Sequence, residues 1–309
     1  GAYDIIKWLI LWSSSYWGWG SIADEDKRLF FTRTWGAFSC LCISGLSLQA
    51  LRNGHRTPYV KPVTVHLARF PHALAGFKIA QISDLHISSL TQPQEIRALV
   101  EQTLALKPDL IAITGDLVDG TPENLWQSVQ PLKQLQAPYG VFFVTGNHEY
   151  YSGVEAWMTT LAELGIRVLR NERVRIGDLE HAFDLAGIDD FTAHQFAWGH
   201  KSDIFRAVEG RDQTRELIVM AHQPRSIHDV ASIKAGLMLS GHTHGGQIWP
   251  FGYVVRLVQP YISGLHRHAD TQIYVSTGTG SWGPPMRLNT ELELTLLSLY
   301  PESNASEIA

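Results

Sequence analysis

The chain has 309 residues, of which 45% are hydrophobic and 18% are charged, and its formal net charge is −5. This composition excludes an intrinsically disordered chain, and the absence of a long basic run gives no support for nucleic-acid binding. Its two cysteines, Cys40 and Cys42, are too few for a disulfide framework, so we interpret them as small apolar residues. Because the chain opens with Gly1, we expect a fragment or a processed form.

Residues 1–66 differ in composition from the rest of the chain. Two stretches without charged residues occur there, one between Lys7 and Asp24 with four tryptophans, and one at residues 34–51. A helix that spans a bilayer needs about 20 mostly apolar residues, with roughly 17 as a lower limit, so the second stretch qualifies by length. Basic residues lie on both sides of it, and the distribution of positive charge therefore gives no orientation.

Three interpretations of this region compete. The first is the last membrane helix of a truncated anchor. The second is an export signal, because Lys27-Arg28 before an apolar stretch resembles a twin-arginine signal with one Arg replaced by Lys. The third is a buried amphipathic segment of a soluble protein. We favour the anchor, and we predict an N-terminal membrane-associated or signal-like region at residues 1–66, followed by one domain at residues 67–309.

From Phe77 onward, short apolar runs alternate with helical patterns. Runs rich in branched residues predict strands at residues 78–83, 110–114, 141–145, 217–220, 237–240 and 273–276. Apolar residues share one helical face at 96–104, with Pro93 near the start, and another at 154–164, with Gly165 placed to end the helix. This alternation predicts a layered α/β domain. Residues 189–213 fit no period, and we expect a loop-rich cap there.

Five polar patches follow the apolar runs. In chain order they are Asp84-Leu85-His86, Gly115-Asp116-Leu117-Val118-Asp119, Gly146-Asn147-His148-Glu149, Ala221-His222 and Gly241-His242-Thr243-His244. In open α/β sheets, ligands bind beyond the carboxyl ends of the strands, and residues two apart on an extended segment point to the same side. Glycine before a ligand permits a sharp turn and close backbone approach. Carboxylate, amide and imidazole ligands together suit Mn, Fe or Zn.

The order D-x-H, G-D-x-x-D, G-N-H-E, H, G-H-x-H resembles the calcineurin-like metallophosphoesterase superfamily over roughly residues 77–300. The resemblance implies a layered β-sandwich flanked by helices and a site for two divalent metal ions. It implies that one ion is held by Asp84, His86 and His244. A second ion is held by Asn147, His222 and His242, and Asp116 bridges the two. His148 is then a catalytic residue beside the scissile group, oriented by Asp119.

The chemistry of these residue types agrees with those roles. Paired cations activate water as a nucleophile and neutralise the charge that builds on phosphoryl oxygens. A departing alkoxide needs a proton, and histidine titrates in the useful range, so His148 is the candidate donor with Asp119 fixing its tautomer. A turn-capping carboxylate is the alternative for Asp119. For Glu149 we prefer a structural ion pair.

Longer flanking segments resemble a bacterial membrane-anchored subgroup of that superfamily. They lie at residues 81–87, 147–153, 240–248 and 277–287. Some members of the subgroup hydrolyse the pyrophosphate of UDP-2,3-diacylglucosamine in lipid A assembly, which implies the bacterial inner membrane as the location. Arg287 in the last segment is a candidate to pair with a substrate phosphate, and a surface ion pair is an equal alternative.

The sequence therefore predicts a dinuclear-metal phosphoesterase that hydrolyses a phosphodiester or pyrophosphate bond, with a lipid-linked substrate such as UDP-2,3-diacylglucosamine. A soluble nucleotide or cyclic-nucleotide phosphodiesterase, or a phosphomonoesterase, is the alternative within the same chemistry. A non-catalytic metal-binding scaffold is a remote alternative that a missing ligand would favour, and none is missing. A metallo-β-lactamase-type hydrolase would need an early H-x-H-x-D-H run, which the sequence lacks.

Overall fold

The computed structural model of the chain describes residues 25–196 and 198–302. The first charge-free stretch, between Lys7 and Asp24, lies outside the described residues. Contacts along the chain divide it into two units, Gly1–Leu48 and Gln49–Ala309. Each unit is described by itself.

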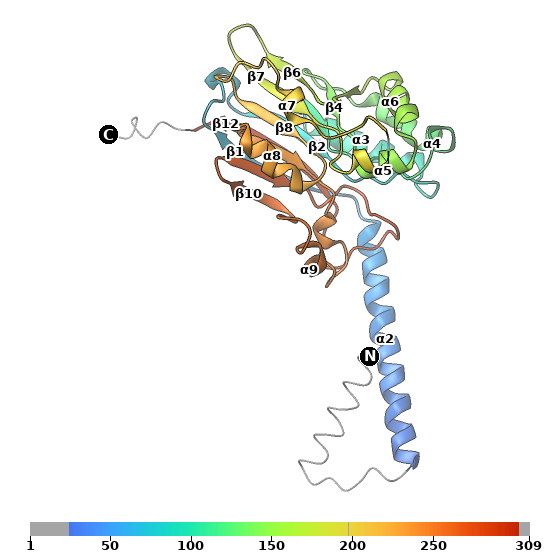
Figure 1. Cartoon of the computed structure of the whole chain (residues 1–309). Coiled ribbons are helices and arrows are strands. Elements are labelled where there is room, and N and C mark those ends of the chain that lie inside the picture. Colours follow the sequence, from blue (N-terminus) through green and yellow to red (C-terminus); the bar gives the residue numbers. More distant parts are fainter. Residues whose placement is uncertain (1–24, 197, 303–309) are drawn as a thin grey trace. The chain divides into compact units, whose positions relative to one another are not determined.

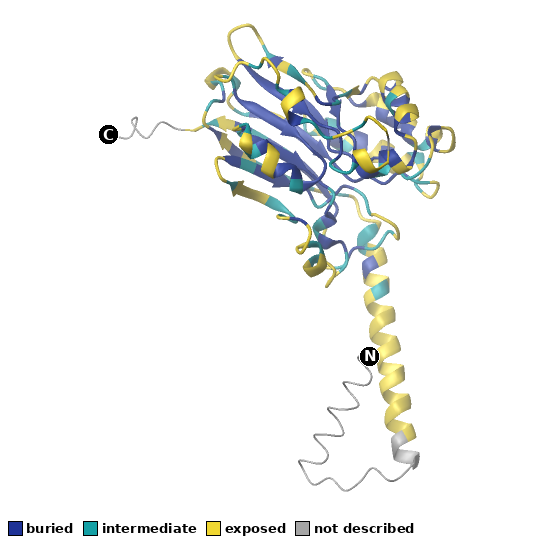
Figure 2. Cartoon of the chain, viewed as in Figure 1, coloured by how far each residue is buried: buried dark blue, intermediate teal, exposed yellow. Residues whose placement is uncertain are grey.

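The described part of the first unit is helical. Helix α2 (Glu25–Gly54) begins there and ends six residues into the second unit. Residues 29–46 are exposed, including large apolar side chains such as Phe30, Trp35 and Leu41 (Figure 2). Leu29–Gly54 is long and apolar enough to cross a membrane, by length and composition, and a signal sequence passes the same test. Within the described residues most of this stretch is exposed, as a membrane anchor or a signal would be.

The second unit is built on two six-stranded sheets (Figure 1). The first sheet has the order β1 (Tyr59–Leu67), β12 (Glu293–Pro301), β2 (Phe77–Ile82), β3 (Leu110–Ile113), β4 (Val141–Phe143) and β5 (Arg167–Val168). Strands β2 to β5 are parallel, whereas β12 runs antiparallel to β2 and parallel to β1. Edge strand β1 tolerates Pro62, because a proline is accommodated where no further strand needs its N–H.

The second sheet has the order β10 (Gly264–His268), β11 (Thr271–Val275), β9 (Leu237–Ser240), β8 (Leu217–Met220), β7 (Ala182–Gly187) and β6 (Glu172–Gly177). Its four inner strands are parallel, and β10 and β6 close the two edges as antiparallel partners. Strands β8 and β9 are buried along their whole length, as expected for parallel strands that are covered on both faces.

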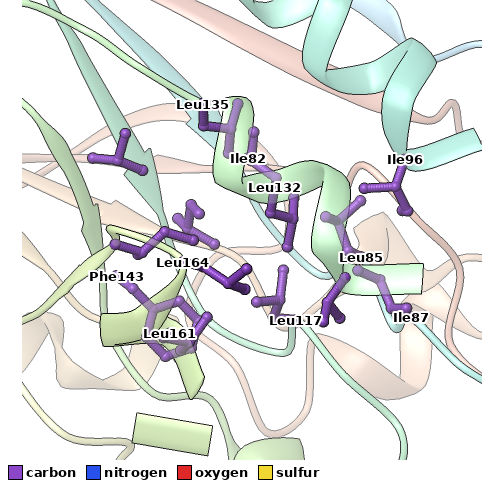
Figure 3. Packing of buried hydrophobic residues seen from close by; sticks show 14 of the residues in the cluster. Ile82, Leu85, Ile87, Ile96, Leu117, Leu132, Leu135, Phe143, Leu161 and Leu164 are labelled. Atoms are coloured by element: carbon purple, nitrogen blue, oxygen red, sulfur yellow. The ribbon is translucent and has the colours of Figure 1, made fainter. Parts of the chain in front are cut away.

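Three apolar cores hold the layers together. The core between the sheets joins residues such as Ile79 and Phe142 of the first sheet to Phe183 and Ile218 of the second. Helices α3 (Pro93–Ala105), α4 (Pro122–Val129) and α6 (Val154–Glu163) share a second core with the outer face of the first sheet (Figure 3). Short helices α7 (Ile204–Ala207) and α8 (Ile227–Ser232) cover the outer face of the other sheet. The fold is an α/β sandwich flanked by helices, as predicted.

The strand and helix predictions can be compared element by element. The six apolar runs coincide with β2, β3, β4, β8, β9 and β11, and the two helical patterns coincide with α3 and α6. Pro93 is the first residue of α3, and the backbone N–H of Gln92 donates to Glu95 at 2.9 Å as in a capping box. Strand β1 crosses the predicted boundary between residues 66 and 67, so the sandwich takes in residues that the sequence placed in the N-terminal region.

Replacing Phe183 by alanine tests the core between the sheets. Its ring is fully buried and lies 5.2 Å from the ring of Phe77 and 5.5 Å from that of Phe70, centroid to centroid. We expect the free energy of unfolding to fall by about 3–5 kcal/mol, because the deletion leaves a cavity that neighbouring strands cannot close. Denaturant unfolding measures the change. Phe205→Ala, at a side chain that is 63% exposed, is the matched control and should change stability by less than about 0.5 kcal/mol.

Candidate metal centre

The predicted site residues lie at the carboxyl ends of strands from both sheets. Asp84 and His86 follow β2, Asp116 and Asp119 follow β3, Asn147 and His148 follow β4, His222 follows β8, and His242 and His244 follow β9. Parallel strands place these ends at the same edge of each sheet. The structure therefore gathers all five polar patches, which lie between Asp84 and His244 in the sequence, into one place.

A first cluster contains Asp84, His86 and His244, and one ligand atom from each lies within 4.8 Å of the others. Nε2 of His86 lies 3.1 Å from Nε2 of His244, which is 3.5 Å from Oδ1 of Asp84. All three residues are buried. Nδ1 of His86 donates to the carboxylate of Asp119 at 3.1 Å, so its Nε2 is left with a lone pair directed at the cluster.

A second cluster contains Asp116, His222 and His242, again with ligand atoms within 4.8 Å of one another. Nε2 of His222 lies 3.1 Å from Nδ1 of His242 and 3.0 Å from Oδ2 of Asp116. The other ring nitrogen of His222 donates to the backbone carbonyl of Thr114 at 2.8 Å, which directs Nε2 into the cluster. Thr114 could not be found from the sequence, because it acts through its backbone carbonyl.

Asp116 lies between the two clusters. The same carboxylate oxygen, Oδ2, is 3.0 Å from Nε2 of His222 and 3.8 Å from Nε2 of His86. The Asp116 side chain is buried, so its charge is poorly screened by water. The geometry is that of a carboxylate shared by two neighbouring groups of ligands.

The residues present fit a pair of divalent cations. Oδ1 of Asn147 is buried and has no hydrogen-bond partner among the described residues, which is costly for an amide oxygen unless a cation or another donor meets it. Burial would lower the pKa of His222, but the charge of Asp116 outweighs it and raises that pKa well above its usual value. The site thus attracts positive charge, and a cation would take the place of that proton. Nitrogen and oxygen ligands in this proportion suit Mn, Fe or Zn.

The backbone is strained where the ligand groups are held. Five candidate ligands have positive φ: Asp84 at 53°, His86 at 49°, Asp116 at 50°, His242 at 71° and His244 at 50°. Left-handed conformations are uncommon for residues other than glycine and cost of order 1–3 kcal/mol each when the surroundings enforce them. Such outliers cluster at functional sites, which supports the assignment of this edge as the site.

Two glycines allow the loops to approach this closely. A Cβ on Gly241 would collide with Oγ of Ser83 and Oδ2 of Asp84, and a Cβ on Gly146 would collide with Oδ1 of Asp116. The sequence predicted close backbone approach at these glycines, and the contacts agree with it.

His148 and Asp119 lie beside the clusters. Nδ1 of His148 is 2.5 Å from Oδ1 of Asp119, and its backbone N–H donates to Asp116 at 2.9 Å. Burial would raise the pKa of Asp119, but hydrogen bonds from His148 and His86 outweigh it and lower that pKa. The carboxylate is therefore ionised and accepts from both rings. Asp119 is not a turn cap in the structure, and it fixes the tautomer of His148 with the proton on Nδ1.

Glu149 makes no ion pair among the described residues, so that part of its interpretation is wrong. Its buried carboxylate accepts backbone N–H groups from Asp116 at 3.0 Å, Leu117 at 2.8 Å and Gly146 at 2.6 Å. Burial raises the pKa of Glu149 to about 7. The side chain ties the turn after β3 to the turn after β4, and its role is structural, as expected, through backbone hydrogen bonds.

Arg287 was predicted either to pair with a substrate phosphate or to form a surface ion pair, and its contacts in the structure differ from both. It is fully buried, so it is not in a surface ion pair. Its guanidinium donates to the carbonyls of Thr277 at 2.7 Å and His244 at 3.1 Å and also to that of Gly280, and Nη2 lies 3.0 Å from Nδ1 of His244. Because its nitrogens are engaged in this way, we do not assign Arg287 to phosphate binding. It fastens the loop that carries His244 to the loop after β11.

A cavity of about 340 Å³ opens beside the clusters. Its lining includes His86 and Asp119, together with apolar side chains such as Leu90, Ile96 and Leu99. Arg56, Ser88 and Glu95 add polar groups to the wall. A mixed lining next to ligand residues provides room for a substrate with both polar and apolar parts.

Comparisons with known proteins agree with this geometry. The sequence profile of the calcineurin-like phosphoesterases matches residues 77–246. A Helicobacter pylori protein described as an uncharacterized metallophosphoesterase is 36% identical over 267 residues, covering 86% of this chain and 70% of that protein. A Bos taurus transmembrane protein with metallophosphoesterase domain is 37% identical over 274 residues, covering 85% of this chain and 62% of that protein. An uncharacterized metallophosphoesterase of Aquifex aeolicus is 33% identical over 247 residues, covering 79% of this chain and 93% of that protein. The chain therefore belongs to the calcineurin-like phosphoesterase family and is a metallophosphoesterase.

Proposed function

We propose that this metallophosphoesterase hydrolyses a phosphodiester or pyrophosphate bond of a lipid-linked substrate, and that UDP-2,3-diacylglucosamine represents the class. The main support for phosphoester hydrolysis is the pair of ligand clusters joined by Asp116, with His148 and Asp119 beside them. Phosphoryl transfer depends mainly on positioning and on neutralising negative charge, and such a site supplies both.

The ligand roles follow from the two clusters. In our proposal Asp84, His86 and His244 hold one cation, and Asn147, His222 and His242 hold the other. Asp116 is shared between them. When bound, two divalent cations supply an activated water nucleophile and stabilise charge on the phosphoryl oxygens.

His148 supplies the proton for the leaving group in this proposal. Since Asp119 accepts from Nδ1 of His148, the proton that the doubly protonated ring can give away is the one on Nε2. Burial would lower the pKa of His148, but the hydrogen bond to Asp119 outweighs it and raises that pKa, so the ring holds a proton to donate. The His148 side chain keeps 16% of its surface exposed, so the ring is not sealed inside the protein.

The lipid-linked substrate is inferred from two features. The cavity beside His86 has apolar side chains in its lining, and it also includes Gly54, the last residue of α2. Leu29–Gly54 is a candidate membrane span, and a Bos taurus relative is named as a transmembrane protein. We propose that α2 anchors the enzyme to the bacterial inner membrane. A substrate held in the same membrane would then reach the cavity without leaving the lipid surface.

Substitution of His148 by alanine tests the proton donor. We expect kcat for an alkyl phosphodiester to fall by about 10²–10⁴-fold, while the content of bound Mn²⁺ is unchanged, because the side chain is a donor in our proposal and not a ligand. A diester with a nitrophenol leaving group should lose less, since that group departs without a proton. His194→Ala, at an exposed histidine, is the control. Equal losses for both leaving groups would contradict the assignment.

Substitution of Glu149 by alanine tests the link between the ligand-bearing turns. Three backbone N–H groups lose their acceptor, and we expect the affinity for Mn²⁺ to fall by about 10–100-fold. Calorimetric titration of the metal-free protein measures this. Glu163→Ala, at an exposed position on α6, should bind Mn²⁺ as the parent protein does. Unchanged affinity in the Glu149 variant would show that the turns hold their positions without it.

A comparison of three substrates tests the proposed class. We expect the protein with Mn²⁺ to hydrolyse UDP-2,3-diacylglucosamine faster than a bis-aryl phosphodiester, and both faster than a phosphomonoester, with kcat/KM as the measure. A higher kcat/KM for a soluble nucleotide or cyclic nucleotide than for UDP-2,3-diacylglucosamine would contradict the lipid-linked substrate and favour a soluble nucleotide phosphodiesterase. No turnover of any of them by the metal-loaded protein would favour the non-catalytic scaffold.

A further inference from the structure

The segment that follows His244 in the sequence carries several exposed apolar side chains. We call this apolar surface the α9 patch, after helix α9 (Gly252–Val255), which has no buried residue. Leu257 is 83% exposed and every other member is at least 49% exposed. The members are Trp249, Phe251, Tyr253, Val254, Leu257, Val258 and Trp282. Apolar groups gathered on one surface mark interaction sites more often than chance exposure does.

The α9 patch is a fixed part of the domain. The backbone N–H of Trp249 donates to Leu288 at 3.0 Å, and Ile248 and Leu288 form a parallel bridge. The side chain of Gln247 is bonded in both directions to the backbone of Trp282, at 2.7 and 2.9 Å. These bonds join the segment at 247–258 to the one at 282–288, so the apolar side chains are presented by an ordered scaffold.

The same scaffold is fastened to the last turn of the candidate membrane span, within the second unit. The backbone N–H of Arg287 donates to the carbonyl of Ala50 at 2.9 Å, and Nδ2 of Asn53 donates to the carbonyl of Arg287 at 3.2 Å. A Cβ on Gly54 would collide with the carbonyl of Pro285, so the last residue of α2 is in direct contact with the loop that contains Pro285. If α2 crosses a bilayer, the α9 patch is held close to the point where α2 leaves it.

The composition of the α9 patch suits a lipid surface. Tryptophan and tyrosine favour the membrane interface, and aliphatic side chains such as Val254 and Leu257 favour the acyl region. Arg256 is exposed within the segment, and Arg52 and Arg56 are exposed at the end of α2. No acidic residue occurs from residue 230 to residue 269. Exposed basic residues complement anionic headgroups.

We propose that the α9 patch inserts into the membrane interface and docks the metallophosphoesterase domain on an anionic lipid bilayer. This inference rests on the membrane anchor in the proposed function and is independent of the substrate. Helix α9 lies directly on the G-H-x-H loop, because a Cβ on Gly246 would collide with Cα of Gly252. Docking would therefore bring the metal centre to the level of the lipid headgroups.

The test places a fluorescent reporter on the α9 patch of the full chain. In a Cys40→Ser, Cys42→Ser background, Val254→Cys or Leu257→Cys is labelled with an environment-sensitive dye, and the protein is reconstituted in vesicles of phosphatidylethanolamine and phosphatidylglycerol at 3:1. We expect blue-shifted emission and quenching by spin-labelled lipid at both positions. Leu179→Cys, 89% exposed in the β6–β7 turn, is the control and should behave as in water. An unchanged midpoint of thermal unfolding shows that each variant is folded.

A second reporter separates failure of the inference from failure of the anchor. Native Cys40, labelled in a Cys42→Ser variant, reports whether α2 is in the bilayer. Quenching at Cys40 without quenching at residues 254 and 257 would overturn the docking of the α9 patch and leave the anchor standing. Absence of quenching at all three positions would overturn both. Neither result depends on whether the protein hydrolyses a phosphoester.

Discussion

Close approach of backbone segments is the constraint on which the metal centre depends. Imidazole and carboxylate groups from both sheets can converge only if the loops that carry them touch, and side-chain atoms at the contact points would prevent this. Glycines 146 and 241 leave that space free, the first beside Asp116 and the second beside Asp84. Hydrogen bonds then hold the loops where the glycines let them meet: Glu149 accepts from the turns after β3 and β4, and Arg287 donates to the loops after β9 and β11.

The sandwich supplies the rigidity that the strained loops need. Five candidate ligands adopt left-handed backbone conformations, which an unsupported loop would relax. Each of these residues follows a strand that is almost wholly buried, and the strands are fixed by cores on both of their faces. The free energy gained by burying those strands offsets the local cost of the left-handed conformations at their ends.

Strands could be recognised in the sequence where burial and an unbroken apolar composition coincide; β7 is buried along its whole length but contains Asp184 and two small residues at its end, and it was not predicted. Strands such as β3 and β8 are covered on both faces and appear as unbroken apolar runs, which are easy to recognise. Strands β1 and β6 lie at sheet edges, carry charged or proline residues and alternate in exposure, so they were not predicted. The candidate ligands could be found because polar residues directly follow the apolar runs. The burial of Arg287 could not be found, because most of its partners are backbone carbonyls, which no residue type in the sequence indicates.

One carboxylate of this site touches two rings with different proposed tasks. Asp119 accepts from Nδ1 of His86, a candidate ligand, and from Nδ1 of His148, the candidate proton donor. The same negative charge therefore acts on the ring that is proposed to bind a cation and on the ring that is proposed to release a proton. A substitution at Asp119 would therefore change both properties together, cation binding and proton release, and neither could be altered alone at this position.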